Sequence, residues 1–113
     1  MDFNFDPKQN ELVELAREIA RKEIAPRALD IDKTGVMDET LLDILKSSGM
    51  TSLSVPKEYG GAGLDLLTSA IIAEELGKGC AGVATICAAN ALASYPILIG
   101  GSDAQKKEFC ECR

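Results

Sequence analysis

The sequence contains no histidine and no tryptophan, and only 4% of its 113 residues are aromatic. Without histidine, neither a serine nor a cysteine has the base that usually activates it for nucleophilic catalysis. A zinc site with histidine ligands is excluded for the same reason, and the four cysteines lack the spacing of a paired Cys-x-x-Cys site. We therefore predict no catalytic residue and no metal ligand in this chain.

Basic residues are also scarce, with 12 Lys and Arg against 18 Asp and Glu and a net charge of −6. Because the bases are scattered singly, they form no patch that would follow a phosphate backbone, and we expect no nucleic acid partner. Residues 1–11 include Asp2, Asp6 and Glu11 and hold no apolar signal-peptide core. We expect a cytoplasmic protein, or a mitochondrial matrix protein if a presequence has been removed.

We expect no structural disulfides among the four cysteines, because such disulfides are rare in a chain without a secretory signal. Cys80 and Cys87 are seven residues apart and would share one helix face, so we expect both to be buried, inert thiols. Cys110 and Cys112 lie near the end of the sequence and are expected to be exposed and oxidisable.

What the sequence does have is helical periodicity: 46% of its residues are apolar, and most of these are aliphatic. Apolar residues recur at spacings of three and four, which is typical of helices packed on one face. Helices are predicted over 6–25, 38–48, 66–78, 81–94 and 104–112, begun by Asp6, Asp38, Asp65 and Asp103 as N-caps. The fold class predicted for residues 1–113 is a single all-α domain, a five- or six-helix up-and-down or orthogonal bundle.

Two prolines are expected to interrupt this pattern, because proline lacks the amide hydrogen that continues a helix. Pro26 should kink or restart the first helix, with one or two more turns before Gly35. Pro96 should begin a short separate segment that runs through Ile99.

The third and fourth helices carry the densest apolar sequence. We expect 66–78 to be buried on most sides, with Glu74 and Glu75 at its exposed edge. The run from Gly79 to Ser102 contains no charged residue and is long enough to span a bilayer. It is rich in Ala and Gly and has several polar residues, so we predict a central helix surrounded by the others and no membrane span.

The segment 55–65, Val-Pro-Lys-Glu-Tyr-Gly-Gly-Ala-Gly-Leu-Asp, is dense in glycine. A phosphate-binding loop is disfavoured because no Gly-Lys-Ser/Thr follows, and because a carboxylate at Asp65 would repel phosphate at the helix start. We predict instead a connector in which glycines permit positive φ and close backbone approach.

The small residues of 81–94 allow two interpretations. They could permit tight packing between helices, or they could form a wall that leaves room for an apolar ligand chain. Asn90 interrupts this surface and would need a hydrogen-bond partner if buried.

Several segments, in order, resemble the N-terminal helical domain of acyl-CoA dehydrogenases. They are Ala25-Pro26, Asp32-Lys33-Thr34-Gly35, Leu45 through Met50, Pro56 through Gly63, Ala73 through Gly77, Ala81-Gly82-Val83, Pro96-Ile97 and Gly100 through Lys107. Pro56-Lys57-Glu58-Tyr59-Gly60-Gly61-Ala62-Gly63 is the most specific of these, and together they cover nearly the whole chain.

The resemblance implies an oxidoreductase that uses FAD to dehydrogenate an acyl-CoA thioester across its α and β carbons. It also implies an electron-transferring flavoprotein as electron acceptor, a homo-oligomer (a tetramer in the family), and β and C-terminal helical domains beyond residue 113. The catalytic Glu and most FAD and CoA contacts of the family belong to those domains. No cofactor-binding residue is therefore assigned here, and these 113 residues alone are expected to be inactive and to bind no FAD tightly.

The same resemblance places part of the acyl-tail pocket on the helix 81–94, at Thr85, Ala88, Ala89 and Leu92. Ala88 stands where some relatives have a larger polar residue, which suggests room for a longer or branched tail. Replacing Ala89 by Phe is expected to shorten the preferred acyl chain. Two alternatives stay open: a free-standing helical module that binds acyl chains or partner proteins, and a related acyl-CoA oxidase.

Overall fold

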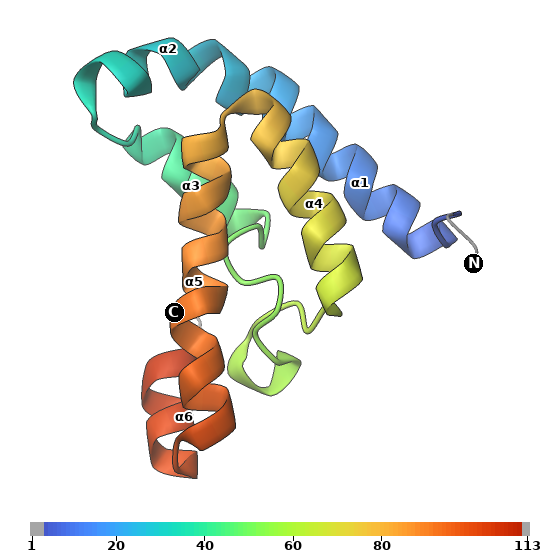
Figure 1. Cartoon of the computed structure of the whole chain (residues 1–113), viewed down its shortest axis with the longest axis vertical. Coiled ribbons are helices and arrows are strands. Elements are labelled where there is room, and N and C mark those ends of the chain that lie inside the picture. Colours follow the sequence, from blue (N-terminus) through green and yellow to red (C-terminus); the bar gives the residue numbers. More distant parts are fainter. Residues whose placement is uncertain (1–3, 112–113) are drawn as a thin grey trace.

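The computed structural model describes residues 4–111, and all regular structure within that range is helical. Figure 1 shows six α-helices in a flat arrangement, in which α1 lies along α4, and α4 and α5 form a hairpin. Their bounds are α1 Pro7–Ile19, α2 Ala25–Thr34, α3 Glu39–Ser47, α4 Leu66–Gly79, α5 Ala81–Gly100 and α6 Asp103–Cys110. A π-helical turn η1 (Ala20–Ile24) joins α1 to α2, and a 3-10 turn η2 (Lys57–Tyr59) precedes α4. The predicted all-α fold is confirmed.

Side-chain caps begin α1, α3, α4 and α6, as the sequence predicted at three of these positions, whereas α2 and α5 have none. Asp6 forms a capping box with Gln9 at the start of α1, where its carboxylate accepts from the Gln9 amide at 2.8 Å. Asp38 accepts from the Leu41 amide at 2.8 Å and so begins α3. At α6 the prediction was off by one residue, because Ser102 is the cap and Asp103 is already helical.

Asp65 begins α4 in the predicted way. Its carboxylate accepts from the Thr68 amide at 2.9 Å and from the Thr68 hydroxyl at 2.8 Å. The bond from the Thr68 amide is the main cause that lowers the pKa of the Asp65 carboxyl. The residue at this helix start is thus an ionised carboxylate that occupies the free amides, which agrees with a connector rather than a phosphate loop.

The kink or restart predicted at Pro26 is not a break: the backbone stays helical from Pro7 to Thr34, and a π-helical turn lies between α1 and α2 just before the proline. α4 ends against this turn at Gly79. A Cβ atom at Gly79 would lie 2.8 Å from the carbonyl oxygen of Ala20 and 3.0 Å from the Cβ of Ile24. Only glycine lets the end of α4 approach the π turn this closely.

The core is aliphatic and draws one or more residues from α1, α3, α4 and α5. Its buried members are Ala16, Ile19, Ile24, Leu41, Leu45, Met50, Ile72, Leu76, Val83 and Cys87. The connector 55–65 uses its glycines as predicted: Gly60 and Gly63 have positive φ, of 85° and 59°. A Cβ at Gly61 would lie 2.1 Å from the Val55 carbonyl oxygen, so the turn folds directly onto the segment before it.

The predicted burial of α4 and α5 was wrong. The molecule measures 41 × 39 × 21 Å, and 21 Å is the thickness of two helix layers, since one helix with side chains is about 10–12 Å across. No helix can be surrounded in two layers. Leu66 and Leu67 of α4 are 74% and 63% exposed, and α5 buries only Val83 and Cys87.

Pro96 does not divide α5, contrary to prediction. The helix continues to Gly100, because an interior proline removes one main-chain hydrogen bond without necessarily ending the helix. Among the described residues, α5 is the one helix long and apolar enough to cross a membrane by length and composition. Only 11% of that stretch is buried in this structure. The absence of a membrane span stays a prediction.

Candidate functional site

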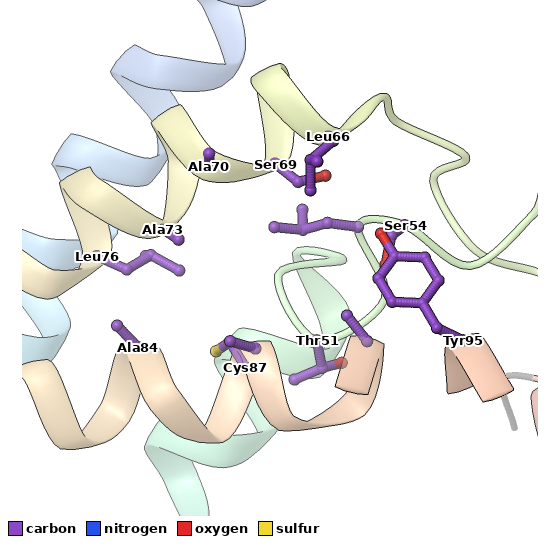
Figure 2. Close-up of a pocket in the computed structure, with 13 residues that line it drawn as sticks. Thr51, Ser54, Leu66, Ser69, Ala70, Ala73, Leu76, Ala84, Cys87 and Tyr95 are labelled. Carbon is purple, nitrogen blue, oxygen red and sulfur yellow. The ribbon is translucent and has the colours of Figure 1, made fainter. Parts of the chain in front are cut away.

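An apolar cavity of about 180 Å³ lies between α4 and α5, and the segment 51–54 closes one side of it (Figure 2). α4 contributes Leu66, Ser69, Ala70, Ala73 and Leu76; α5 contributes Ala84, Cys87, Ala88, Ala91 and Tyr95; the segment contributes Thr51, Leu53 and Ser54. An engineered cavity of about 150 Å³ with apolar walls is known to hold one benzene molecule. The space therefore suits a compact hydrocarbon group.

The cavity exists because alanines face each other across the helix pair. Ala84, Ala88 and Ala91 are spaced by four and three residues, which places them on one face of α5. Ala70 and Ala73 stand opposite them on α4, as Figure 2 shows for Ala70, Ala73 and Ala84. Methyl side chains on both walls leave space that larger aliphatic residues would fill.

The two ends of the cavity differ in chemistry. Leu76 and Cys87, which are 0% and 7% exposed, are at the inner end together with Ala73 and Ala84. Leu66 and Tyr95, 74% and 37% exposed, are at the outer end. Figure 2 places the hydroxyl-bearing residues Ser54, Ser69 and Tyr95 on that outer side. Thr51, which also carries a hydroxyl, lies beside Cys87 in Figure 2, so polar side chains line more of the cavity than its outer end.

The Cys87 thiol is uncharged in this setting. Burial raises its pKa to about 11, so it acts as a small apolar wall residue, as predicted. Cys80, at the N-cap of α5, is only half-buried, so the prediction of burial was wrong for it. Cys110 is 3% exposed, contrary to prediction, because α6 folds back against α5. Cys112 lies outside the described residues.

Of the four residues predicted to line an acyl-tail pocket, the structure places one at the cavity and three away from it. Ala88 lines the cavity, although it is exposed like the other three, whereas Thr85, Ala89 and Leu92 lie on another face of α5 and do not line it. The Thr85 hydroxyl donates to the Ala81 carbonyl oxygen at 2.9 Å, and Leu92 is 77% exposed. Their contact with a ligand stays a prediction.

Sequence reasoning missed the α4 side of the cavity completely. Its signal was present as Ala70 and Ala73, two small residues three apart in a strongly apolar helix. Reading 84, 88 and 91 as one face of α5 would also have located the other wall.

Asn90, exposed rather than buried, nevertheless has a partner: its side-chain amide donates to the Thr51 carbonyl oxygen at 2.9 Å and ties α5 to the segment that closes the cavity.

Apart from the cavity, a cluster of charged side chains lies around Glu75, where α1 packs along α4. This carboxylate is 5% exposed, so its predicted place at an exposed edge was wrong. Arg17 donates to it from Nε at 3.2 Å and from Nη2 at 3.1 Å, and Lys78 donates at 2.7 Å. The hydrogen bond from Arg17 is the largest of the causes that lower the pKa of Glu75. Because its pKa is lowered and its oxygens are engaged by Arg17 and Lys78, Glu75 is a poor proton acceptor, and we assign the cluster a structural role.

No set of three His, Cys, Asp or Glu side chains within residues 4–111 is placed to hold a metal ion. The apolar cavity thus remains the candidate site. Residues 6–111 match the family model described as acyl-CoA dehydrogenase, N-terminal domain. The chain belongs to the acyl-CoA dehydrogenase family.

Individual relatives are similar over nearly the whole chain. The cyclohex-1-ene-1-carbonyl-CoA dehydrogenase of Syntrophus aciditrophicus (strain SB) is 39% identical over 90% of this chain and 25% of its own length. The solved butyryl-CoA dehydrogenase of Megasphaera elsdenii is 37% identical with a TM-score of 0.85, over 97% of this chain and 30% of that one.

A chain from structural work on the electron transferring flavoprotein of Acidaminococcus fermentans, directed at flavin-based electron bifurcation, has a TM-score of 0.87 at 33% identity. That match covers 99% of this chain and 31% of the other. The chain therefore spans between a quarter and a third of the length of the relatives it matches. It corresponds to the N-terminal helical domain of this family of oxidoreductases.

Proposed function

We propose that this chain is the helical domain of an FAD-dependent acyl-CoA dehydrogenase, and that the cavity between α4 and α5 receives the end of the acyl tail. The observation that carries the proposal is the cavity itself: an apolar space between two helices, in a domain whose relatives are named for acyl-CoA substrates. Its volume of about 180 Å³ favours a compact branched or cyclic tail over a long straight one.

The residues of this chain act by binding and by excluding water. The alanines and Leu76 offer no polar group to compete with a hydrocarbon tail, so burying each methylene contributes about 0.8 kcal/mol to binding. Binding energy from a part of the substrate that does not react serves to hold the reacting carbons in place. We assign no acid or base to this chain, because no Asp, Glu, Lys or Arg side chain of the described residues lines the cavity.

The cavity does not fit a flavin dinucleotide. Pockets for ligands of drug size have volumes of about 300–1,000 Å³, and this one is smaller and lined mainly by aliphatic residues. No residue here is therefore assigned to FAD, whose chemistry when bound is to accept the β hydride. In the assembled enzyme we propose a Glu outside these residues as the base that removes the α proton, an electron-transferring flavoprotein as acceptor and a homo-oligomeric state.

The test is a pair of substitutions in the FAD-loaded whole protein, Ala88→Phe and Ala89→Phe. Ala88 lines the cavity and Ala89, its neighbour, lies on an exposed face of the same helix. Ala88→Phe should lower kcat/KM for acyl-CoA substrates with bulky tails by about tenfold or more, since it fills the space, and should spare short tails. The measurement is kcat/KM across tails of increasing size, with FAD content and circular dichroism as checks of folding.

The two variants distinguish a tail that binds in the cavity from a tail that binds along the other face of α5, where the family resemblance places Ala89. If Ala89→Phe shortens the preferred tail and Ala88→Phe does not, the tail lies along the other face of α5. Unchanged size preference in both variants would refute the tail pocket on this helix. Failure of the parent protein to turn over any acyl-CoA would refute the proposed activity itself.

A further inference from the structure

We propose that the ring of Tyr95 limits the size of the acyl tail by closing the outer end of the cavity, which makes this residue a determinant of substrate specificity. The inference rests on the proposed function and adds to it a chemical class of substrate, acyl-CoA thioesters whose tails end in a short or branched hydrocarbon group. It starts from a change of side-chain size along one face of α5.

The cavity face of α5 is built from small side chains until it reaches Tyr95. Within residues 81–100, all of which the structure describes, the residues that line the cavity are Ala84, Cys87, Ala88, Ala91 and Tyr95. The alanines and Tyr95 follow one another by four, three and four residues, which places them on one helix face. Small side chains leave the space open, whereas a tyrosine ring occupies it. The open space along this wall therefore ends at Tyr95.

The helix itself directs the ring over the cavity. Long side chains in an α-helix adopt rotamers that point toward the helix N-terminus and onto the preceding turn. For Tyr95 that turn contains Ala91, the preceding residue of the cavity lining, so the ring leans back over the lined space. Figure 2 shows the ring extending from α5 toward Ser54, on the segment that closes one side of the cavity.

The segment that faces the ring is tied to α5. The side-chain amide of Asn90 donates to the Thr51 carbonyl oxygen at 2.9 Å, five residues before Tyr95 on the helix. Because Thr51 and Ser54 belong to one short segment, this hydrogen bond limits how far Ser54 can move away from the ring. The outer end therefore stays narrow as long as residue 95 is large.

A compact tail and a long tail respond differently to this ring. A branched group that fits into about 180 Å³ exchanges water for apolar walls and for the face of the ring, which favours its binding. A long straight tail meets the ring before all of its methylene groups are buried. Each methylene left in water forgoes a factor of about four in affinity. Tyr95 therefore selects for compact tails both by contact with small groups and by obstruction of long ones.

The experiment compares Tyr95→Ala with the parent in the FAD-loaded whole protein. The substrates are 4-methylpentanoyl-CoA, whose tail ends in a compact branch, and octanoyl-CoA, whose tail is long and straight. The measured quantity is the ratio of kcat/KM for octanoyl-CoA to kcat/KM for 4-methylpentanoyl-CoA. Tyr95→Phe is the matched control, because it keeps the ring and removes only the hydroxyl. Ile99→Ala is a second control, since it shortens an exposed residue farther along α5 that does not line the cavity.

The parent should favour the branched tail, and Tyr95→Ala should raise the ratio by about tenfold, the effect of burying one or two more methylene groups. Tyr95→Phe and Ile99→Ala should leave the ratio unchanged. Tyr95→Leu should raise it by a smaller factor, and this variant serves as the test if Tyr95→Ala does not retain FAD.

An unchanged ratio in Tyr95→Ala would overturn the proposal, and so would a parent that favours octanoyl-CoA. A ratio raised equally in Tyr95→Phe would overturn it as well, because the hydroxyl and not the ring would then limit the tail. If neither substrate is turned over but other acyl-CoA substrates are, the proposed tail class is wrong and the proposed function stands. If no acyl-CoA reacts at all, the proposed function fails instead.

Discussion

Glu75 shows at the scale of one residue how tertiary packing overrides a sequence pattern. Two adjacent glutamates in a helix normally indicate a solvated edge, and Glu74 is indeed exposed. Glu75, one residue on, points 100° around the helix toward α1, where Arg17 meets it with two nitrogens. Glu14 also pairs with Arg17, and Lys78 pairs with both Glu74 and Glu75.

Glu75→Gln should therefore destabilise the protein at neutral pH. Because its hydrogen bonds are charge-assisted but its partners Arg17 and Lys78 are half exposed, we expect a loss of about 1–2 kcal/mol in the free energy of unfolding. Glu74→Gln, the exposed neighbour, should have little effect. The measurement is denaturant unfolding of the whole protein and of both variants at matched pH.

The pH dependence of this loss has a definite sign. The pKa of Glu75 is lower in the folded state than the ordinary value of 4.5, so the ionised form stabilises the fold. The contribution is present above pH 4.5 and is lost as the pH falls through the lowered pKa. The difference between parent and Glu75→Gln should shrink over that acidic range. A difference that is equally large at neutral pH and well below pH 4 would contradict this account.

At the scale of elements, local chemistry decides where helices begin, and the sequence predicts those points well. Asp6, Asp38 and Asp65 are caps because each carboxylate accepts from an amide of the first helical turn that has no partner in the helix. The end of α5 was predicted poorly. Pro96 and the polar residues before it suggested a break, whereas the helix continues to Gly100, which shows that a proline constrains a helix without dictating its end.

The cap at Asp38 gives a prediction at this scale. Asp38→Ala removes the acceptor of the Leu41 amide and should cost about 1 kcal/mol of stability. Asp38→Asn keeps a capping oxygen and should cost much less, even though it loses the weak ion pair with Arg27 at 3.6 Å. Thermal unfolding of both variants separates the two effects. Equal losses in Ala and Asn variants would mean that the ion pair, and not the cap, stabilises α3.

At the scale of the whole molecule, the flat two-layer shape leaves large apolar side chains uncovered. Leu66, Leu67, Leu92, Ile99 and Phe109 are each more than 60% exposed, and they belong to α4, α5 and α6. Exposed apolar surface of this kind promotes association with another surface. The relatives are three to four times as long as this chain, so we expect other parts of a full-length protein to cover these side chains.

Expressed as these 113 residues alone, the protein should associate or bind an apolar dye, and it should neither bind FAD tightly nor dehydrogenate acyl-CoA. Size-exclusion chromatography with light scattering, flavin absorbance and a dehydrogenase assay check these outcomes. Replacing Leu92 and Ile99 together by Lys should reduce association, since both lie on the exposed side of α5. A yellow preparation that retains FAD through chromatography would contradict the expectation.

The sequence by itself determined the fold class, the family, the helix starts and the glycine connector, because caps, periodicity and turn residues act within a few positions of one another. It also named one wall residue of the cavity, Ala88. Only the tertiary structure decided which face of α5 meets α4, which glutamate is buried and which cysteines are covered. Those facts depend on how distant helices pack in two layers, and burial is a property of the pair in contact and not of either sequence segment alone.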